Sequence, residues 1–282
     1  MPQEALPLGA ERTASSAPQD LVRRGQKLWD LTLGRQASLR LERVILPGLR
    51  WNQEIYATWL RSHVDETTDW LDAGCGRRLL PPDFETLEHE LMNVAKLAIG
   101  VDLNVDSVLR HKTLTRRMCA SLEGLPFPDD SFDLVTCNMV VEHLPNPSRT
   151  FREFSRVLRP GGVLLIHTPN VWNYAICLAR VLRKLVPERL LVKMISWSEK
   201  RQDADIFPTF YRANSRSSIT SQLDRLGFSC ERYEMLVGPQ TVCRFFAPVA
   251  FCEALLMKAT MSRALQSFAT TMIFTFRKTS PR

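Results

Sequence analysis

The residues best suited to chemistry in this sequence gather in a short glycine loop. The loop Asp72–Gly76 reads DAGCG and follows an apolar run that begins at Asp69. A second apolar run, Leu97–Asp102, ends in an acid. A strand, a glycine turn, a helix and a second strand ending in an acid place backbone N–H groups and a carboxylate around one nucleotide-like ligand. We therefore expect Asp102 to accept hydrogen bonds from the two hydroxyls of a ribose.

The elements that position this loop alternate regularly along the chain from Thr67. Short apolar runs alternate with amphipathic helical segments, and this pattern is typical of a parallel sheet covered on both faces. The expected strands are residues 69–73, 97–102, 118–120, 132–138, 162–167, 228–237 and 271–277. The expected helices are residues 21–46, 52–63, 105–115, 150–158, 214–226 and 245–268, and a basic helical stretch at 171–201.

The loop by itself does not decide which ribose-containing ligand binds. A dinucleotide fingerprint needs a third glycine at position 79, where this chain has Leu79. A phosphate-binding Walker loop needs Gly-Lys-Ser/Thr at its end, and this loop has none. Both NAD and S-adenosylmethionine (SAM) carry the diol that Asp102 would hold, so the choice depends on sequence blocks further along the chain.

Four blocks in order select between these ligands: WLDAGCG from Trp70, GVDLN from Gly100, SLEGLPFPDDSFDLVTCNMVVEHL from Ser121 and FSRVLRPGGVLLIHTPN from Phe154. With them the sequence resembles the class I SAM-dependent methyltransferases, and is similar to the branch of ubiquinone and menaquinone biosynthesis methyltransferases. The resemblance covers roughly residues 50–170. It implies an α/β fold with a Rossmann-like, seven-stranded, mostly parallel sheet, helices on both faces and an antiparallel last strand.

The resemblance also implies which residues bind the cofactor, SAM. Asp72, Gly74, Cys75 and Gly76 would surround its methionine end. Asp102 would bind the ribose, with Leu103 against the adenine. Ser121 and Leu122 would lie at the adenine edge, and Asn138 near the sulfonium. The loop departs from the family at Arg78, where relatives usually have a third glycine, and at Ser121, where many have Asp. We therefore expect a reshaped loop and a late start of the following helix.

The acceptor side is less specific in sequence. Glu142 and His143 follow the fourth expected strand, where either side chain would serve as a general base or simply pack in the loop. Trp172 and Asn173 follow the fifth strand, and Tyr211 and Arg212 belong to a dense aromatic and basic cluster; we expect these four to contact substrate. His167 is expected to be a core histidine, Cys75 a packing residue, and Trp51, Asn52 and Tyr56 to close the cofactor site.

Composition limits the cellular setting. The net charge of +7 suits an anionic membrane surface or anionic substrate as well as a nucleic acid. The seven cysteines include no CxxC, which indicates reduced thiols in a cytoplasmic protein and no metal site. Residues 1–20 lack the apolar core of a signal peptide and are expected to be a disordered tail.

The expected organisation is a helical N-terminal cap at 21–64 and a methyltransferase domain at 65–282. Helical insertions interrupt that domain at about 171–210 and 239–269. Both insertions are rich in apolar residues. They would form a lid over a small-molecule or lipid-like acceptor, lie peripherally on an anionic membrane, or pack on the core. The oligomeric state is left open.

Two other functions stay open. A non-catalytic SAM-fold scaffold would explain Arg78 and Ser121. A nucleic-acid methyltransferase is disfavoured, because amino-methylating enzymes usually carry Asn/Asp-Pro-Pro-aromatic after the fourth strand, and this chain has Asn138-Met139-Val140-Val141. We therefore expect no nucleic-acid partner.

Overall fold

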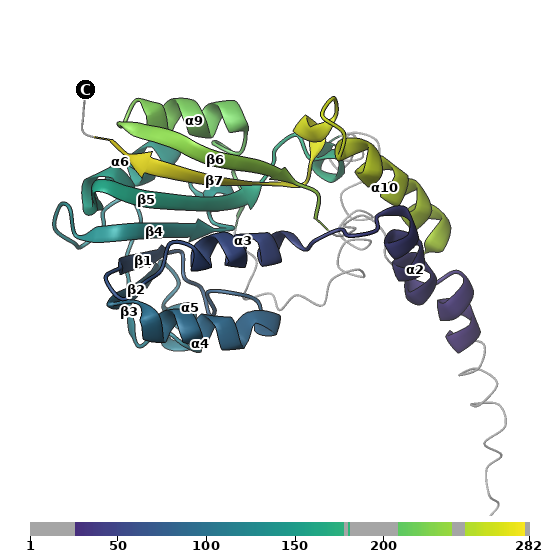
Figure 1. Ribbon diagram of the computed structural model, residues 1–282, viewed down its shortest axis with the longest axis horizontal. Coiled ribbons are helices and arrows are strands. Elements are labelled where there is room, and N and C mark those ends of the chain that lie inside the picture. The colour runs from purple at the N-terminus through teal and green to yellow at the C-terminus, as the bar shows by residue number, and fades with distance from the viewer. Residues whose placement is uncertain (1–25, 178–179, 181–207, 239–245, 280–282) are drawn as a thin grey trace, which may run out of the picture.

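The computed structural model describes residues 26–177, 180, 208–238 and 246–279. The expected tail at 1–20 and most of the first insertion lie outside these residues, and the expectations for them stay predictions. The described strands form a single seven-stranded sheet in the order β3-β2-β1-β4-β5-β7-β6 (Figure 1). The strands are β1 Asp69–Ala73, β2 Leu97–Asp102, β3 Arg116–Cys119, β4 Phe132–Asn138, β5 Leu158–Pro169, β6 Phe228–Leu236 and β7 Thr271–Lys278.

The strand directions confirm the predicted Rossmann-like class. Neighbouring strands from β3 to β5 run parallel, and β7 runs antiparallel to both β5 and β6. The carboxyl ends of the parallel strands therefore meet at one edge. That edge carries Ala73, Asp102, Asn138 and Pro169, the last residues of β1, β2, β4 and β5. Ligands of open α/β sheets bind at this edge.

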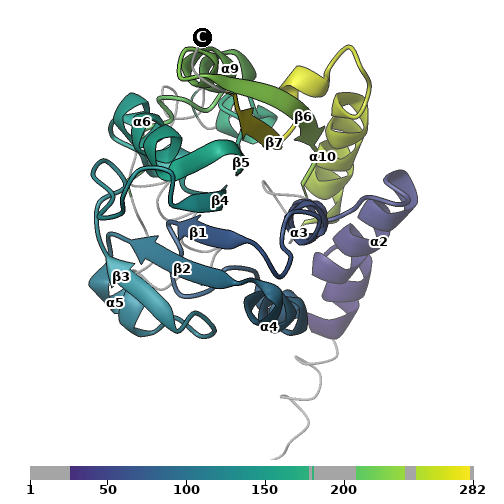
Figure 2. The ribbon, with the colours of Figure 1, turned by 60° about the vertical axis from the view of Figure 1, so that its left-hand side comes forward.

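Side chains alternate between the two faces of the sheet and build two separate cores. Trp70, Leu134 and Leu165 pack with α3 (Asn52–Arg61) and α4 (Glu85–Val94) on one face. Their chain neighbours Leu71, Val135 and Leu164 pack with α6 (Pro147–Val157) and α9 (Arg216–Asp224) on the other. Figure 2 shows the helices on either side of the strands. Helices on both faces are thus confirmed.

Two helices end at other residues than expected, and each difference has a local cause. The helix predicted for residues 21–46 is interrupted at 33–34, and α2 occupies Arg35–Ile45. A Cβ on Gly34 would lie 2.6 Å from the Asp30 Cα, so the chain passes itself closely there. The helix predicted for 105–115 is short: α5 spans Val105–Leu109. His111 Nδ1 then accepts from the backbone amides of Thr113 and Leu114 and stabilises a turn.

The N-terminal helices serve two different parts of the molecule. α3 lies on the sheet, whereas α2 packs along α10 (Ala247–Thr260). Leu46, Ala254 and Met257 belong to a third apolar cluster between these elements (Figure 1). The described residues also form short 3₁₀ turns at Pro82–Phe84, Val141–His143 and Gln266–Phe268. Among the described residues, no helix has the length and apolar character needed to cross a bilayer.

Candidate active site at the carboxyl edge of the sheet

The glycine loop folds over the end of β2. The backbone amides of Gly74 and Cys75 both donate to the Val101 carbonyl, at 2.7 and 3.0 Å. Gly74 and Gly76 have φ of +82° and +55°, in the left-handed region that favours glycine. A Cβ on Gly74 would lie 2.3 Å from Val140 Cγ2, so Gly74 lets the loop after β4 pack against the loop after β1.

The Asp102 carboxylate lies between the loop and the start of α5. Its Oδ2 accepts from the Gly76 amide at 2.9 Å, and its Oδ1 accepts from the Asn104 amide at 2.8 Å. The helix cap is Asn104, whose side chain accepts from the Ser107 amide. Asp102 is therefore not the cap of α5. Each carboxylate oxygen keeps further acceptor capacity for a ligand hydroxyl.

The surroundings of Asp102 fit a nucleoside. A Cβ on Gly76 would meet no atom within 4 Å, so the loop faces open space there. Leu103, next to the acid, is 74% exposed and offers an apolar surface to a flat base. Ser121 and Leu122 follow β3, whose continuation at Ala120 donates to the Asp102 carbonyl at 3.1 Å. The structure thus brings the predicted ribose and adenine residues together, and they suit SAM.

Asp72 and Cys75 point into the protein. Thr136 Oγ1 donates to Asp72 Oδ1 at 2.7 Å and accepts from Trp70 Nε1 at 2.8 Å. Burial raises the pKa of the Asp72 carboxyl to about 7, although the Thr136 hydrogen bond opposes the shift. Burial also raises the pKa of the Cys75 thiol, which lies over Gly100. Asp72 therefore supports the loop from the sheet, and Cys75 has the environment of a packing residue.

The second half of the loop is organised by two arginines and one buried acid. Arg77 pairs with Asp106 at 2.7 Å and Arg78 with Glu85 at 3.6 Å. The buried Glu88 carboxylate accepts from the backbone amides of Leu79 and Leu80. This arrangement replaces the family's third glycine and delays α4 to Glu85, as the sequence predicts. Glu88 is a residue that sequence reasoning missed.

Asn138 is held by a residue that the sequence analysis did not name. Its side-chain amide exchanges two hydrogen bonds with Gln53 of α3, at 3.1 and 3.3 Å. Asn138 Oδ1 also lies 2.8 Å from His167 Nδ1. Because an amide oxygen only accepts, His167 carries its proton on Nδ1. Gln53 precedes Tyr56 and Leu60 by three and seven positions, so helical periodicity places it on the same face of α3.

His167 is the expected core histidine. It is fully buried and stacks on Tyr56, with ring centroids 5.6 Å apart. Burial lowers its pKa to about 3, so the ring is neutral. Its Nε2 and the Tyr56 hydroxyl are buried without a hydrogen-bond partner among the described residues. Both atoms can still form hydrogen bonds, and they lie in the interior beside Asn138, at the edge where a cofactor would bind.

Glu142 and His143 are connected and oriented by distant segments. Glu142 is buried, and its Oε2 accepts from Thr168 Oγ1 at 3.0 Å. Thr168 Oγ1 in turn accepts from Asn214 Nδ2 at 2.7 Å. Burial raises the pKa of Glu142, while the charge of His143 opposes the shift. His143 Nε2 lies 4.0 Å from Glu142 Oε1.

The segment 208–212 lies across the Glu142 turn. Phe210 and Tyr211 donate their backbone amides to the Glu142 carbonyl, at 2.7 and 3.2 Å. His143 Nδ1 lies 3.0 Å from the Pro208 carbonyl, which can only accept, so this nitrogen carries the proton. Arg212 bonds the Pro145 carbonyl. The structure therefore gathers four predicted residues, Glu142, His143, Tyr211 and Arg212, in one place.

Trp172 and Asn173 lie just beyond β5 but differ in exposure. Trp172 is 54% exposed. Asn173 is buried, with Oδ1 accepting from the Ala175 amide and Nδ2 donating to the Thr270 carbonyl. The Asn173 amide thus joins the chain after β5 to the chain before β7. Substrate contact by these two residues stays a prediction.

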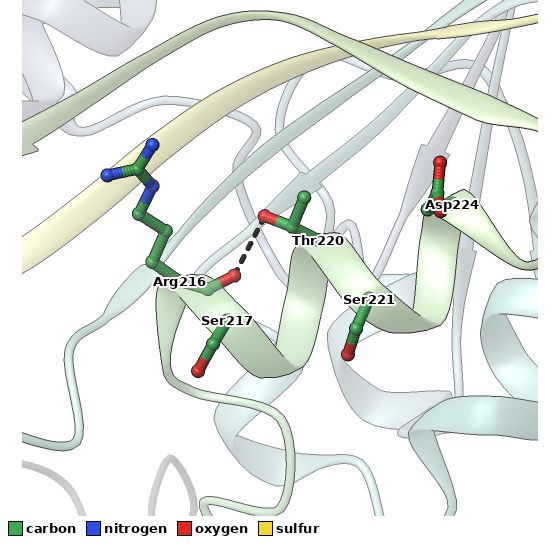
Figure 3. A pocket seen from close by; sticks show the side chains of 5 residues that line it. All are labelled: Arg216, Ser217, Thr220, Ser221 and Asp224. Atoms are coloured by element: carbon green, nitrogen blue, oxygen red, sulfur yellow. Dashed lines mark hydrogen bonds between the residues drawn. The ribbon is translucent and has the colours of Figure 1, made fainter.

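A depression elsewhere on the surface lies on the outer face of α9 (Figure 3). Arg216, Ser217, Thr220, Ser221 and Asp224 line it. Thr220 Oγ1 bonds back to the Arg216 carbonyl at 2.8 Å, and the Arg216 guanidinium lies 3.8 Å from the Tyr233 ring centroid. None of these residues belongs to the predicted site, so we interpret this feature as a hydrated helix face. Within the described residues, no group of His, Cys, Asp or Glu has an arrangement that would hold a metal ion.

Comparisons with known proteins match the part of the chain that forms this edge. A family model described as a methyltransferase domain matches residues 71–166, which include Asp72, Asp102, Asn138 and Glu142. A probable S-adenosylmethionine-dependent methyltransferase of Mycobacterium tuberculosis is 39% identical over 106 residues, 36% of this chain and 36% of the relative. A ubiquinone biosynthesis O-methyltransferase of Xanthomonas oryzae is 32% identical over 135 residues, 42% of this chain and 51% of the relative.

The chain therefore spans about a third to a half of the length of these curated relatives. Among solved structures, an S-adenosylmethionine-dependent methyltransferase from Mesorhizobium loti superposes with a TM-score of 0.50 and 19% identity. That match covers 80% of this chain and 100% of the other, and it shows a shared fold. Residues 71–166 thus match a methyltransferase-domain family, and part of the chain is similar in sequence to S-adenosylmethionine-dependent methyltransferases, whose fold it shares.

Proposed function

We propose that this protein transfers the methyl group of SAM to a small-molecule or lipid-like acceptor. The observation that carries the proposal is the position of Asp102. Its carboxylate accepts from the amides of Gly76 and Asn104, next to the open space at the Gly76 Cβ position and to the exposed Leu103. This juxtaposition offers acceptors for a ribose diol beside an apolar surface for adenine, at the edge where the family binds its cofactor.

The cofactor, when bound, supplies an activated methyl group on a sulfonium, so the transfer is an in-line displacement. The protein's work is to hold the acceptor in line and to exclude water. Orientation of this kind can contribute on the order of 7–11 kcal/mol to lowering a barrier. Asn138, fixed by Gln53 and His167, would position the reacting centre at the end of β4.

A base is needed where the acceptor loses a proton. We assign this role to His143 with Glu142. The Pro208 carbonyl keeps the proton on Nδ1, so Nε2 is the basic nitrogen of the neutral ring. Glu142 Oε1, 4.0 Å from Nε2, would stabilise the imidazolium that forms. As the acceptor oxygen or carbon gains the methyl group, its proton passes to Nε2. Tyr211, Arg212 and Trp172 would border the acceptor.

The apolar side chains around this edge support an acceptor with apolar character. Trp172 is exposed beside β5, and Phe210 lies under the Arg212 guanidinium at 5.4 Å. The similarity to proteins described as ubiquinone biosynthesis O-methyltransferases is in line with a hydroxyl on such a molecule. With this function we expect a cytoplasmic protein that contacts a membrane peripherally.

The test has two stages. Calorimetry with SAM and S-adenosylhomocysteine should give saturable binding that Asp102→Ala weakens strongly. Methyl-labelled SAM is then incubated with an extract of the source organism, and label is followed into organic-solvent, aqueous and nucleic-acid fractions. Label in the organic or small-molecule fraction that His143→Ala reduces supports the proposal. Absence of cofactor binding would instead favour a non-catalytic scaffold, and label in nucleic acid would overturn the acceptor class.

A further inference from the structure

The outer face of α10 is apolar although it faces solvent. The exposed residues of this helix are Pro248, Val249, Phe251, Cys252, Leu255, Leu256 and Lys258. Only the last carries a charge. The other charged residue of the helix, Glu253, is buried and accepts from the Tyr174 hydroxyl at 2.8 Å. A helix that is apolar on all sides is expected in a core or at a membrane. We call the first six residues the α10 apolar face.

A second element extends this face beyond the start of α10. Trp29 stacks on Phe246, with ring centroids 6.4 Å apart. The Ala247 amide donates to the Leu33 carbonyl at 2.7 Å, which fixes the chain before α2 against the first turn of α10. Leu28 and Trp29 are 63% and 52% exposed. The apolar surface is therefore continuous across two segments far apart in sequence.

The exposed charges on the two segments that carry this surface have one sign. In residues 26–46 and 246–268 every Lys and Arg is exposed, whereas no Asp or Glu is. The cations are Lys27, Arg35, Arg40, Arg43, Lys258 and Arg263. The acids Asp30 and Glu42 are half-buried, and Glu253 is buried. The fully exposed charged residues on α2 and α10 are thus all positive.

We propose that the α10 apolar face, with Leu28, Trp29 and Phe246, binds the surface of an anionic lipid bilayer. Apolar side chains with aromatic rings at one end and flanking cations are the composition of segments that lie in the membrane interface. Burial of the apolar face would contribute most of the affinity, and each nearby cation adds roughly a fivefold increase on an anionic membrane. This surface is separate from the proposed methyl transfer, and each proposal can fail without the other.

The sequence analysis gave a membrane surface as one of three alternatives for the two insertions. The structure assigns part of it to residues 26–33, which the sequence analysis treated as an N-terminal cap. One side of α10 does pack on the protein, through Ala250, Ala254 and Met257, all fully buried. The packing interpretation therefore holds for that side of the helix, and the interfacial interpretation concerns the opposite side.

The experiment is flotation with vesicles of phosphatidylcholine, with and without phosphatidylglycerol, at low salt. We expect the full chain to float with the anionic vesicles and to bind the neutral ones more weakly. The double variant Leu255→Glu/Leu256→Glu should bind more than about tenfold more weakly, because two side chains lose apolar burial. The matched control is Val105→Glu/Leu109→Glu on α5, where both residues are also exposed; it should bind like the unmodified chain.

Two further measurements test membrane binding if the Leu255/Leu256 variant folds poorly. Hydrogen exchange of the unmodified chain should show protection within residues 246–260 when anionic vesicles are added. Lys258→Ala should weaken anionic binding about fivefold and leave neutral-vesicle binding unchanged. No flotation of the unmodified chain, or equal binding by it and the Leu255/Leu256 variant, would overturn the proposal. Concentration-dependent dimerisation that the variant abolishes, without vesicle binding, would overturn it in favour of a second copy.

Discussion

Asp102 Oδ2 accepts a hydrogen bond from the Gly76 amide at 2.9 Å, and this bond ties the end of β2 to the glycine loop. The same carboxylate is the proposed acceptor for the ribose hydroxyls. Loop shape and ligand recognition therefore depend on one side chain, and a single substitution affects both.

Asp102→Ala should weaken binding of S-adenosylhomocysteine by at least about 3 kcal/mol, roughly 150-fold in Kd, because two charge-assisted hydrogen bonds are lost. Asp102→Asn keeps one acceptor and should lose less. Calorimetry measures both, with Asp83→Ala as a control that removes an exposed acid in the turn before α4. Equal affinities for Asp102→Ala and the unmodified chain would exclude the ribose assignment.

Gly74 is required for a close contact as well as for its backbone angle. Gly74→Ala should destabilise the protein by about 3 kcal/mol or more, because the φ of +82° is strained and the new Cβ meets Val140 Cγ2 at 2.3 Å. Gly161 has the same φ, and a Cβ added there would meet no atom within 4 Å. Gly161→Ala should therefore lose only the stability that the backbone strain costs, about 1–2 kcal/mol.

Urea unfolding of both variants, and of Gly74→Ala combined with Val140→Ala, tests this account. The second substitution removes the clashing methyl groups and should restore part of the lost stability. Equal losses in the two glycine variants would show that the contact with Val140 is unimportant.

The sequence predicted the sheet well because its strands carry strong local signals. β1, β2 and β4 have the predicted bounds, since each is an apolar run bounded by an acid, a glycine or a turn. Helix ends were harder to predict. α5 stops at Leu109 because the His111 ring accepts hydrogen bonds from two backbone amides. The spacing of apolar residues along the sequence does not reveal this interaction.

The candidate site was predicted residue by residue but not as an assembly. Glycines and acids at strand ends have a local signature, and Gly74, Gly76 and Asp102 follow β1 and end β2 as predicted, whereas Asp72 points into the protein. Tyr211 reaches Glu142 through backbone hydrogen bonds between segments far apart in sequence, and Gln53 reaches Asn138 across 85 positions. Such pairings follow from strand order and from the path of the chain over the sheet, so one sequence alone does not specify them.

Thr136 connects two buried polar groups, and its loss should be costly. Thr136→Val conserves shape but removes the donor to Asp72 and the acceptor for Trp70 Nε1. We expect a loss of about 2–4 kcal/mol in the free energy of unfolding near neutral pH, because both partners stay buried without compensation. Thr136→Ser keeps the hydroxyl and should lose less than about 1.5 kcal/mol. Equal stabilities of the Val and Ser variants in urea titrations would contradict this role.

Asp72 should make the stability of the ligand-free protein depend on pH. Its pKa is raised from 3.8 to about 7 by burial, so between these values the folded state binds a proton that the unfolded state has released. The unfolded state binds fewer protons in this window, and the contribution of Asp72 to stability therefore falls as pH rises, by about 1.4 kcal/mol per pH unit.

Asp72→Asn removes this titration. The free energy of unfolding of the variant, minus that of the unmodified chain, should therefore rise between pH 4 and pH 7 and level off above pH 7. Urea titrations at several pH values measure this difference and cancel the groups common to both proteins. A difference for Asp72→Asn that does not change with pH would mean that the Asp72 carboxyl titrates alike in the folded and unfolded states.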